Sequence, residues 1–278
     1  MAKGNVGVAK DAEKTDIHLT YSHTIGLSTM DGRGFYFPVD TAIGSDGKLF
    51  VLSRSYDAEP EPARVTVCNI DSKYYGTFGS FGTGEGQFTW ATAIEVDSED
   101  NVYVSDEYTN RITIFDSAGK FLTAWGVEGD LEGQLDGPSG IAFDSDDFLY
   151  VVDHHNNRIQ KFTKDGTFLF AFGSKGNGVG EFNLPWGITT SHDGNVYVAD
   201  WRNDRVQKFS KDGTFLASYG CPGKGDGQFH RPSSVAVDIE GYIYVADWGN
   251  ERVQVLNSDG QFVMKLRGEG TTSKWAIE

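Results

Sequence analysis

The chain has 278 residues, 35 of them glycine, and a formal net charge of −16. This charge opposes binding to nucleic-acid phosphates or to an anionic membrane, and no run of Lys and Arg offsets it, so neither partner is expected. Two cysteines, Cys68 and Cys221, are too few for a disulfide framework, and both are expected to be reduced. Since no apolar run has the length of a membrane span and no secretory signal opens the chain, a cytoplasmic protein is expected.

Residues 1–16 have the composition of a flexible leader, and residues 17–278 are expected to form one domain. Within that domain, 17–25 is a β-type run and 26–35 is a loop. Gly- or Asp-rich turns then separate four short β-type runs in each of five successive groups, as an antiparallel meander requires. The five groups cover about 36–79, 88–126, 135–173, 182–220 and 229–267.

The four later groups repeat with one period. An aspartate that ends the second run recurs every 47 residues, at Asp106, Asp153, Asp200 and Asp247. An arginine that opens the third run recurs at the same interval, at Arg111, Arg158, Arg205 and Arg252. A period of this size with four strands per unit indicates the blades of an all-β propeller. We expect each aspartate to accept hydrogen bonds from loop N–H groups and to pair with its own arginine.

The first group departs from this pattern. Ser53 stands where the aspartate is expected, and the loop that follows is longer and contains the acidic segment 57–61. Three alternatives are open for the role of that segment: a lid, a contact for a partner, or no function. The loops between groups are more regular, since each ends in a hydrophobic residue that we expect to pack under the next blade. These residues are Phe88, Leu135, Phe182 and Phe229.

The number of blades is not settled by counting. The run at 17–25 resembles the last strand of a blade, but only 268–278 remain after the fifth group to supply its three partners. Either five blades close with an extra edge strand, or a six-blade plan is cut short. We favour the six-blade plan with five complete blades. Because open strand edges pair readily, this plan predicts self-association through the incomplete sixth blade.

Two stretches carry a resemblance to a known family. DGNVYVADWRNDRVQKFSKDG and EGYIYVADWGNERVQVLNSDG are similar to NHL repeats, which are named for an Asn-His-Leu trio at the start of the third strand. The similarity covers 36–267, although arginine stands in place of the histidine. The resemblance implies a propeller but not one function, because NHL propellers include RNA-binding modules, protein-binding modules and enzymes.

Two of these family functions fit poorly. Peptidyl-alpha-hydroxyglycine alpha-amidating lyase, which has this fold, binds zinc through histidines on several blades, and no histidine series recurs here. The RNA-binding members use a basic face, which the net charge of −16 opposes.

The residues between each recurring aspartate and arginine vary, and they should form part of a ring at one mouth of the central channel. Aromatic rings there suit stacking on a sugar, an aromatic ring or a peptide, and an arginine suits an anion. The alternative is that the tryptophans fill gaps between adjacent blades. The candidate ligand-binding residues are Tyr108, His154, Trp186, Trp201, Arg202 and Trp248.

Three histidines are candidates for a metal site. His154 and His155 are adjacent on one of these loops, and His230 lies on the loop before the fifth group. Together they would supply nitrogen ligands to one divalent metal ion.

Two carboxylates interrupt the small residues of the first runs, which should line the channel. Asp40 and Glu95 belong to adjacent groups, and ionised carboxylates are costly to bury without partners. They could hold a divalent cation or act as acid and base, with His155 as a third catalytic candidate. The alternative is that Arg33 or channel water satisfies them.

No nucleophile motif is present, and the Gly-rich strings are not followed by helices, which argues against a dinucleotide site. The sequence therefore favours a propeller that binds a small ligand, a peptide or a protein at its channel mouth. A metal-assisted lyase or hydrolase with its site at the channel axis is the main alternative. A purely structural repeat domain is the third, and it predicts that replacing Trp201 or Trp248 affects folding alone.

Overall fold

The computed structural model describes residues 25, 34–55 and 63–267. The predicted leader, the run at 17–24 and the acidic segment 57–61 lie outside these ranges, as does Arg33. Ile25, the last residue of the predicted closing strand, is described but has no strand assignment. No helix within the described ranges combines the length and apolar character that crossing a membrane demands.

Five four-stranded antiparallel sheets make up the fold. Blade 1 contains β1 (Pro38–Ile43), β2 (Leu49–Ser53), β3 (Arg64–Cys68) and β4 (Tyr74–Phe78). Blade 2 contains β7 (Ala91–Val96), β8 (Val102–Asp106), β9 (Arg111–Phe115) and β10 (Phe121–Trp125). Blade 3 contains β11 (Pro138–Phe143), β12 (Leu149–Asp153), β13 (Arg158–Phe162) and β14 (Phe168–Phe172).

The last two blades follow the same order. Blade 4 contains β15 (Ile188–Thr190), β16 (Val196–Asp200), β17 (Arg205–Phe209) and β18 (Phe215–Tyr219). Blade 5 contains β19 (Pro232–Val237), β20 (Ile243–Asp247), β21 (Arg252–Leu256) and β22 (Phe262–Arg267). Two single-turn 3₁₀ helices, η1 (Trp201–Asn203) and η2 (Trp248–Asn250), follow β16 and β20. A short parallel pair, β5 (Ser80–Phe81) and β6 (Gln87–Phe88), joins blades 1 and 2.

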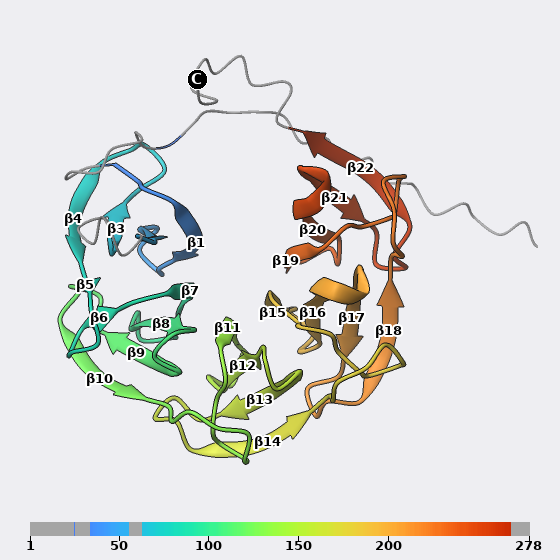
Figure 1. Ribbon diagram of the computed structural model, residues 1–278. Helices are drawn as coiled ribbons and strands as arrows, with labels where there is room; N and C mark the ends of the chain where they lie inside the picture. The colour runs from blue at the N-terminus through green and yellow to red at the C-terminus, as the bar shows by residue number, and fades with distance from the viewer. Residues whose placement is uncertain (1–24, 26–33, 56–62, 268–278) are drawn as a thin grey trace, which may run out of the picture.

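The five sheets stand around a common axis, with the first strand of each blade innermost and the fourth outermost (Figure 1). This confirms the all-β propeller with four-stranded antiparallel blades. Adjacent blades pack in sequence from the first to the fifth, and the described strands leave the ring open between blade 5 and blade 1 (Figure 1). Five blades in an open ring agree with the six-blade plan.

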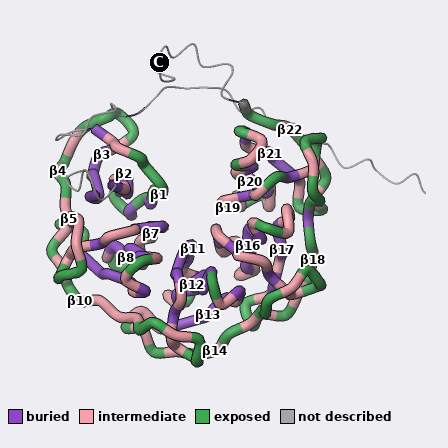
Figure 2. Tube along the Cα trace, in the orientation of Figure 1, coloured by how far each residue is buried: buried purple, intermediate pink, exposed green. Residues whose placement is uncertain are grey.

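Each pair of successive blades shares one hydrophobic core, and the loop residues predicted to pack there do so. Phe88, Leu135, Phe182 and Phe229 are each at most 1% exposed, and each belongs to a different core cluster. The second and third strands contribute most of the remaining buried side chains, while turns and outer strands carry the exposed segments (Figure 2). Burying both faces of a blade in this way removes apolar surface from water and holds neighbours in register.

The predicted aspartate–arginine pairs form in three blades. Asp153, Asp200 and Asp247 are fully buried, and each accepts from the Nε of its own arginine at 2.7–2.9 Å. Blade 2 is the exception, because Arg111 donates to the carbonyl oxygens of Thr83, Gly84 and Gln87 instead of to Asp106. For blade 2 the pairing prediction was wrong. There the Asp106 carboxylate is satisfied by backbone N–H groups alone, including those of Thr89 and Trp90.

A second recurring contact ties each blade to the next. The residue before the arginine has a positive φ of 52–55° in blades 2 to 5, a conformation that asparagine and aspartate tolerate well. In three of these blades its side-chain oxygen accepts from a backbone N–H 27 residues later, in the loop that enters the following blade. The pairs are Asn110 with Gly137, Asn157 with Leu184, and Asp204 with Arg231.

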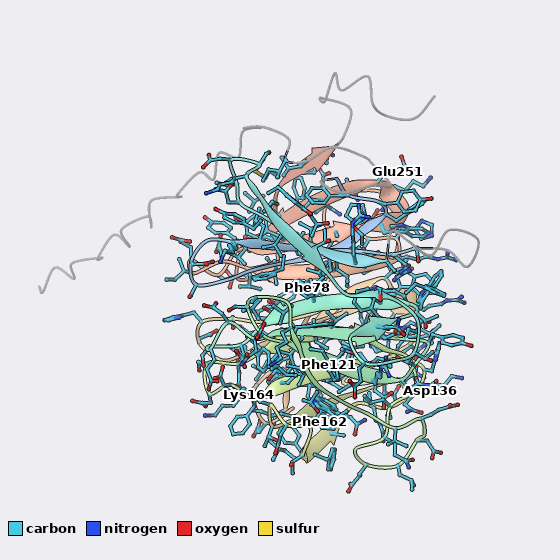
Figure 3. All side chains as sticks on the ribbon, turned by 90° about the vertical axis from the view of Figure 1, so that its left-hand side faces the viewer. Phe78, Phe121, Asp136, Phe162, Lys164 and Glu251 are labelled. Atoms are coloured by element: carbon cyan, nitrogen blue, oxygen red, sulfur yellow. The ribbon has the colours of Figure 1, made fainter. Side chains whose placement is uncertain are left out.

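These contacts place the second-to-third loops and the inter-blade loops on one face of the ring, as predicted. Arg158 on β13 donates to the carbonyl oxygens of Leu131 and Gln134 in an inter-blade loop. Figure 3 shows Asp136 and Glu251, which represent the two kinds of loop, on the same side of the molecule, with Lys164 on the opposite side. We call the side that carries Asp136 and Glu251 the loop face.

Candidate functional site

The channel is lined by the first strands, whose residues form columns that can be compared blade by blade. The strand register shows which positions of the blades are equivalent, because Pro38 pairs with Ser53, Ala91 with Asp106 and Pro232 with Asp247. One position further along the strand, the blades present Val39, Thr92, Ser139, Trp186 and Ser233 in turn. The residue that differs most in this column is Trp186.

A cavity of about 430 Å³ opens at the mouth of the channel on the loop face. Three of its walls are aromatic, because Trp186 precedes β15 and Trp201 and Trp248 open the two 3₁₀ turns. Blade 1 contributes the opposite wall. The full lining is Pro38, Val39, Arg54, Thr92, Trp186, Trp201, Ser233, Ser234 and Trp248. Residues from blades 1, 2, 4 and 5 therefore converge on one hollow.

The tryptophans of the mouth are held by specific contacts. The Trp186 ring lies 6.4 Å from the Trp201 ring and packs edge-on against His154, with centroids 4.9 Å apart. The guanidinium groups of Arg202 and Arg231 each lie 5.0 Å from the centre of the Trp201 ring. These cation–π contacts help to fix the ring of Trp201, which is part of the cavity lining.

Trp248 is different, since it is 60% exposed. A residue that fills a gap between blades would be buried, so this exposure argues against the gap-filling alternative for Trp248. Glycine follows it, and a Cβ at Gly249 would lie 2.7 Å from the His230 ring. The close approach of His230 explains why the chain needs glycine there.

Arg54 is a cavity residue that the comparison of loops in blades 2 to 5 missed. Because Ser53 is equivalent to Asp106, Arg54 belongs to the same column as Glu107, His154, Trp201 and Trp248. Its guanidinium lies 4.4 Å from the centre of the Trp90 ring, and its Nε donates to the Ala91 carbonyl at 3.0 Å. Aligning blade 1 with the other blades at this position identifies Arg54 from the sequence, although blade 1 lacks the aspartate.

A second hollow, of about 340 Å³, continues the mouth cavity down the channel. Val39, Thr92, Trp186, Ser233 and Ser234 line both. Asp40 and Glu95 belong to the deeper hollow, which confirms that the first strands of adjacent blades bring these two carboxylates into the channel.

The two carboxylates lie close to each other and are poorly solvated. Asp40 accepts from the backbone N–H groups of Thr41 and Ile94 at 2.9 and 3.0 Å, and Glu95 accepts from that of Val96 at 3.0 Å. Burial raises the pKa of Asp40 to about 6, against the lowering effect of its two backbone hydrogen bonds. Burial also raises the pKa of Glu95 to about 7, and the Asp40 charge raises it further. Within the described ranges, no Lys, Arg or His forms an ion pair with either.

The third catalytic candidate, His155, lies outside both channel hollows. Its Nδ1 lies 2.9 Å from Asp136 Oδ1, and its Nε2 lies 3.9 Å from Glu107 Oε1. The structure therefore joins Asp40 with Glu95 but does not bring His155 to them.

The three histidines predicted to bind a metal are not assembled into a cluster. His154 is 4% exposed, and its Nδ1 contacts the Pro185 carbonyl oxygen at 2.8 Å, while burial lowers its pKa to about 4. His155 is held by Asp136, and His230 lies against Gly249. Throughout the described part of the chain, no three His, Cys, Asp or Glu side chains are grouped so as to hold a metal ion.

The remaining candidates lie at the edge of the mouth. Tyr108 is 69% exposed and does not line the cavity. Arg202 does not line it either, but its guanidinium contacts the Trp201 ring. His154 supports Trp186 from behind. Of the six predicted ligand-binding residues, the structure therefore brings three, Trp186, Trp201 and Trp248, to the cavity wall.

Solved structures with a similar fold include two lyases and a chain of a nidogen–laminin complex. A streptogramin B lyase is 16% identical, with a TM-score of 0.62 over 87% of this chain and 71% of its own. Virginiamycin B lyase from Staphylococcus aureus is 13% identical, with a TM-score of 0.62 over 87% and 72%. A chain in a nidogen–laminin complex is 16% identical, with a TM-score of 0.60 over 84% and 80%. At these identities the likeness shows the fold alone. No curated protein sequence matches the chain.

The model of the NHL repeat matches residues 135–162, 182–209 and 229–256. Each match begins at a buried loop residue, Leu135, Phe182 or Phe229, and ends with the third strand of blade 3, 4 or 5. These are the three blades in which the aspartate–arginine pair forms. The chain is therefore a β-propeller that contains NHL repeats.

Proposed function

We propose that the protein is a binding propeller whose mouth cavity takes a small ligand, or a side chain of a peptide or protein partner, that has a flat apolar part. The observation that carries this proposal is the convergence of Trp186, Trp201 and Trp248 on one open hollow. Apolar side chains that cluster at a surface mark a binding site more often than scattered ones do, and indole faces stack well on aromatic rings and on sugar rings.

The polar groups of the cavity add orientation. Ser233 and Ser234 lie in the lining, and the Arg54 guanidinium stands across from the tryptophans. A few polar groups in a mostly apolar hollow are typical of ligand sites in which shape and stacking supply affinity.

Replacing Trp201 with alanine tests the proposal. We expect Trp201→Ala to weaken binding of a stacking ligand by at least about tenfold, since a base-sized stacking contact is worth about 1–3 kcal/mol. The ligand is found first by ligand-observed NMR screening of sugars, aromatic compounds and short peptides against the native protein. Dissociation constants for the hits are then measured by calorimetry.

Tyr108→Ala is the matched control, because Tyr108 is an exposed aromatic residue of the equivalent loop in blade 2 that does not line the cavity. It should leave the affinity unchanged. Equal loss in both variants, or a Trp201→Ala protein that differs only in stability, would favour a purely structural role.

An enzyme with its site at the channel axis is the second candidate, and the carboxylate pair favours it. With pKa values of about 6 and 7, Asp40 and Glu95 could exchange a proton near neutral pH. Native mass spectrometry before and after chelation tests the metal-assisted form. A chelator-sensitive mass excess of one divalent ion supports it, and a bare mass contradicts tight metal binding.

A further inference from the structure

The mouth cavity and the deeper channel hollow are direct neighbours with different chemistry. Val39, Thr92 and Trp186 are part of the lining of both hollows, so one ligand that passes these residues would reach from one hollow into the other. The outer end presents three indole rings, and the inner end presents two carboxylates. A ligand that filled both would need an apolar ring and a group that carboxylates attract.

Among the described residues, the inner end has carboxylate acceptors but no cationic side chain. Asp40 and Glu95 are the only titratable residues in the described lining of the deeper hollow, and the others are apolar, glycine, serine or threonine. Every hydrogen bond that the two carboxylates accept from a described residue comes from a backbone N–H group, and Glu95 uses only one of its oxygens for this. One carboxylate oxygen of Glu95 therefore remains for a donor in the channel.

The distance between the two ends suits a molecule of modest length. Thr92 lines the mouth, and Glu95 is three residues further along β7, which corresponds to about 10 Å of extended strand. Asp40 directly follows Val39, so its carboxylate lies between the mouth and Glu95. A ring joined to an ammonium group by a short flexible chain spans this interval.

We propose that the ligand of this site is a cation with a flat apolar part, whose ring lies among Trp186, Trp201 and Trp248 and whose ammonium group binds Asp40 and Glu95. This proposal rests on the proposed function of the mouth and names the class of ligand that it takes: an arylalkylamine, or a peptide that presents an ammonium group beyond an apolar segment. The ammonium group offsets one of the two negative charges, and its place in the deeper hollow keeps it away from Arg54, the one cationic residue in the described lining of the two hollows, which belongs to the mouth. Charge-assisted hydrogen bonds in a desolvated channel supply the preference for the cation.

A pair of probes that differ only in charge tests the proposal. 4-Phenylbutylamine and 4-phenylbutan-1-ol have the same ring and chain, and their dissociation constants are measured by calorimetry at pH 8, where both carboxylates are ionised. We expect the amine to bind at least about tenfold more tightly than the alcohol. In Glu95→Gln and Asp40→Asn, the preference for the amine over the alcohol should fall several-fold, because the amine loses an ionic partner while the alcohol keeps an amide oxygen as acceptor.

The pH dependence gives a second readout. Amine binding should strengthen from pH 5.5 to pH 8 in the native protein as Asp40 and Glu95 ionise, since an alkylamine stays protonated over this range. Alcohol binding should depend on pH much less than amine binding, and Glu95→Gln should flatten the amine profile. A native-like urea unfolding transition shows that each variant is folded.

The outcomes separate the two proposals. If both probes bind equally well, or if the amine preference survives in Glu95→Gln and Asp40→Asn, the cation proposal is overturned while the aromatic mouth stands. If neither probe binds the native protein, although its unfolding transition is intact, the proposal that the mouth accepts a flat apolar group fails as well.

Discussion

Single residues decide how closely the first strands approach one another around the axis. Gly187 is a clear case, because a Cβ built there would lie 2.6 Å from the Ser233 carbonyl oxygen and 2.7 Å from the Ser234 Cα. Both are backbone atoms, which cannot rotate away. Gly140 is the equivalent case between blades 3 and 4, since its N–H donates to the Trp186 carbonyl oxygen at 2.9 Å and a Cβ built there would lie 2.6 Å from that oxygen. Glycine at these positions therefore sets the width of the channel.

We expect Gly187→Ala to lower the free energy of unfolding by about 1–3 kcal/mol, because blades 4 and 5 must separate to admit the methyl group. Urea unfolding measures the change. Thr189→Ala is the control on the same strand: it faces the channel, adds no atoms, and should stay within about 0.5 kcal/mol of the native protein. If Gly187→Ala has native stability, the first strands of blades 4 and 5 can move apart at little cost and the close approach is not required.

At the scale of the element, the turn between the second and third strands is stabilised by one buried network. Asp200 accepts from Asn183 N, Asn203 Nδ2, Arg205 Nε and Gln207 Nε2. Burial raises the pKa of Asp200, and the hydrogen bonds and the Arg205 charge oppose that effect. Such a network favours one conformation of the turn, since each member is satisfied only when the others are in place.

Arg205→Met should cost about 3–5 kcal/mol, because it leaves the buried Asp200 carboxylate without its cation. Arg111→Met is the matched control, since Arg111 occupies the same position in blade 2 and makes the same kind of bonds to inter-blade carbonyl oxygens, but pairs with no carboxylate. We expect a clearly smaller loss for it in urea unfolding. Equal losses would assign the stability to the carbonyl contacts and not to the ion pair.

At the scale of the whole molecule, the two channel carboxylates lower the stability of the folded protein when they are ionised, because the assembled ring of blades partly removes them from water. The pKa of Asp40 rises from 3.8 to about 6 on folding, and that of Glu95 from 4.5 to about 7. Between about pH 4 and pH 7 the folded state therefore binds more protons than the unfolded state, so this pair makes stability fall as pH rises. The penalty is fully present above about pH 7.

Replacing both carboxyls, in D40N/E95Q, should therefore stabilise the protein at pH 8 relative to pH 5. We expect its advantage over the native protein to grow by about 2 kcal/mol or more across this interval, each carboxyl contributing about 1–3 kcal/mol. Urea unfolding at the two pH values measures it. Asp46→Asn is the control from the same blade, because Asp46 is exposed and its pKa is lowered by Lys48. An advantage independent of pH would contradict the assigned pKa values.

The open side of the ring belongs to the same scale. The four core clusters join blades 1 to 5 in sequence, and among the described residues no fifth cluster joins blade 5 to blade 1. Self-association through this side stays a proposal, which sedimentation velocity across a range of protein concentrations would check. A mass that remains monomeric would argue against it.

Much of the fold could be predicted because a repeat displays the same physical requirement several times. The 47-residue period of the aspartates, the hydrophobic residue that ends each inter-blade loop and the small residues of the first strands were sufficient to predict the blades and the channel lining. Departures from the columns likewise predicted that Asp40 and Glu95 lie in the channel and that Trp186, Trp201 and Trp248 gather at its mouth. Local backbone needs of this kind are visible in sequence, since each is met by residues close in the chain.

What the tertiary structure alone decided are the relations between blades. It showed that Arg54 joins the mouth, that His155 and His230 lie apart from the carboxylates, and that Arg111 turns to inter-blade carbonyl oxygens. It also showed that the mouth cavity and the deeper channel hollow are neighbours that share lining residues. The physical reason is that side-chain rotamers, and distances between residues far apart in the chain, depend on how the blades pack against one another. Aligning equivalent positions of the repeats gives no information about that packing.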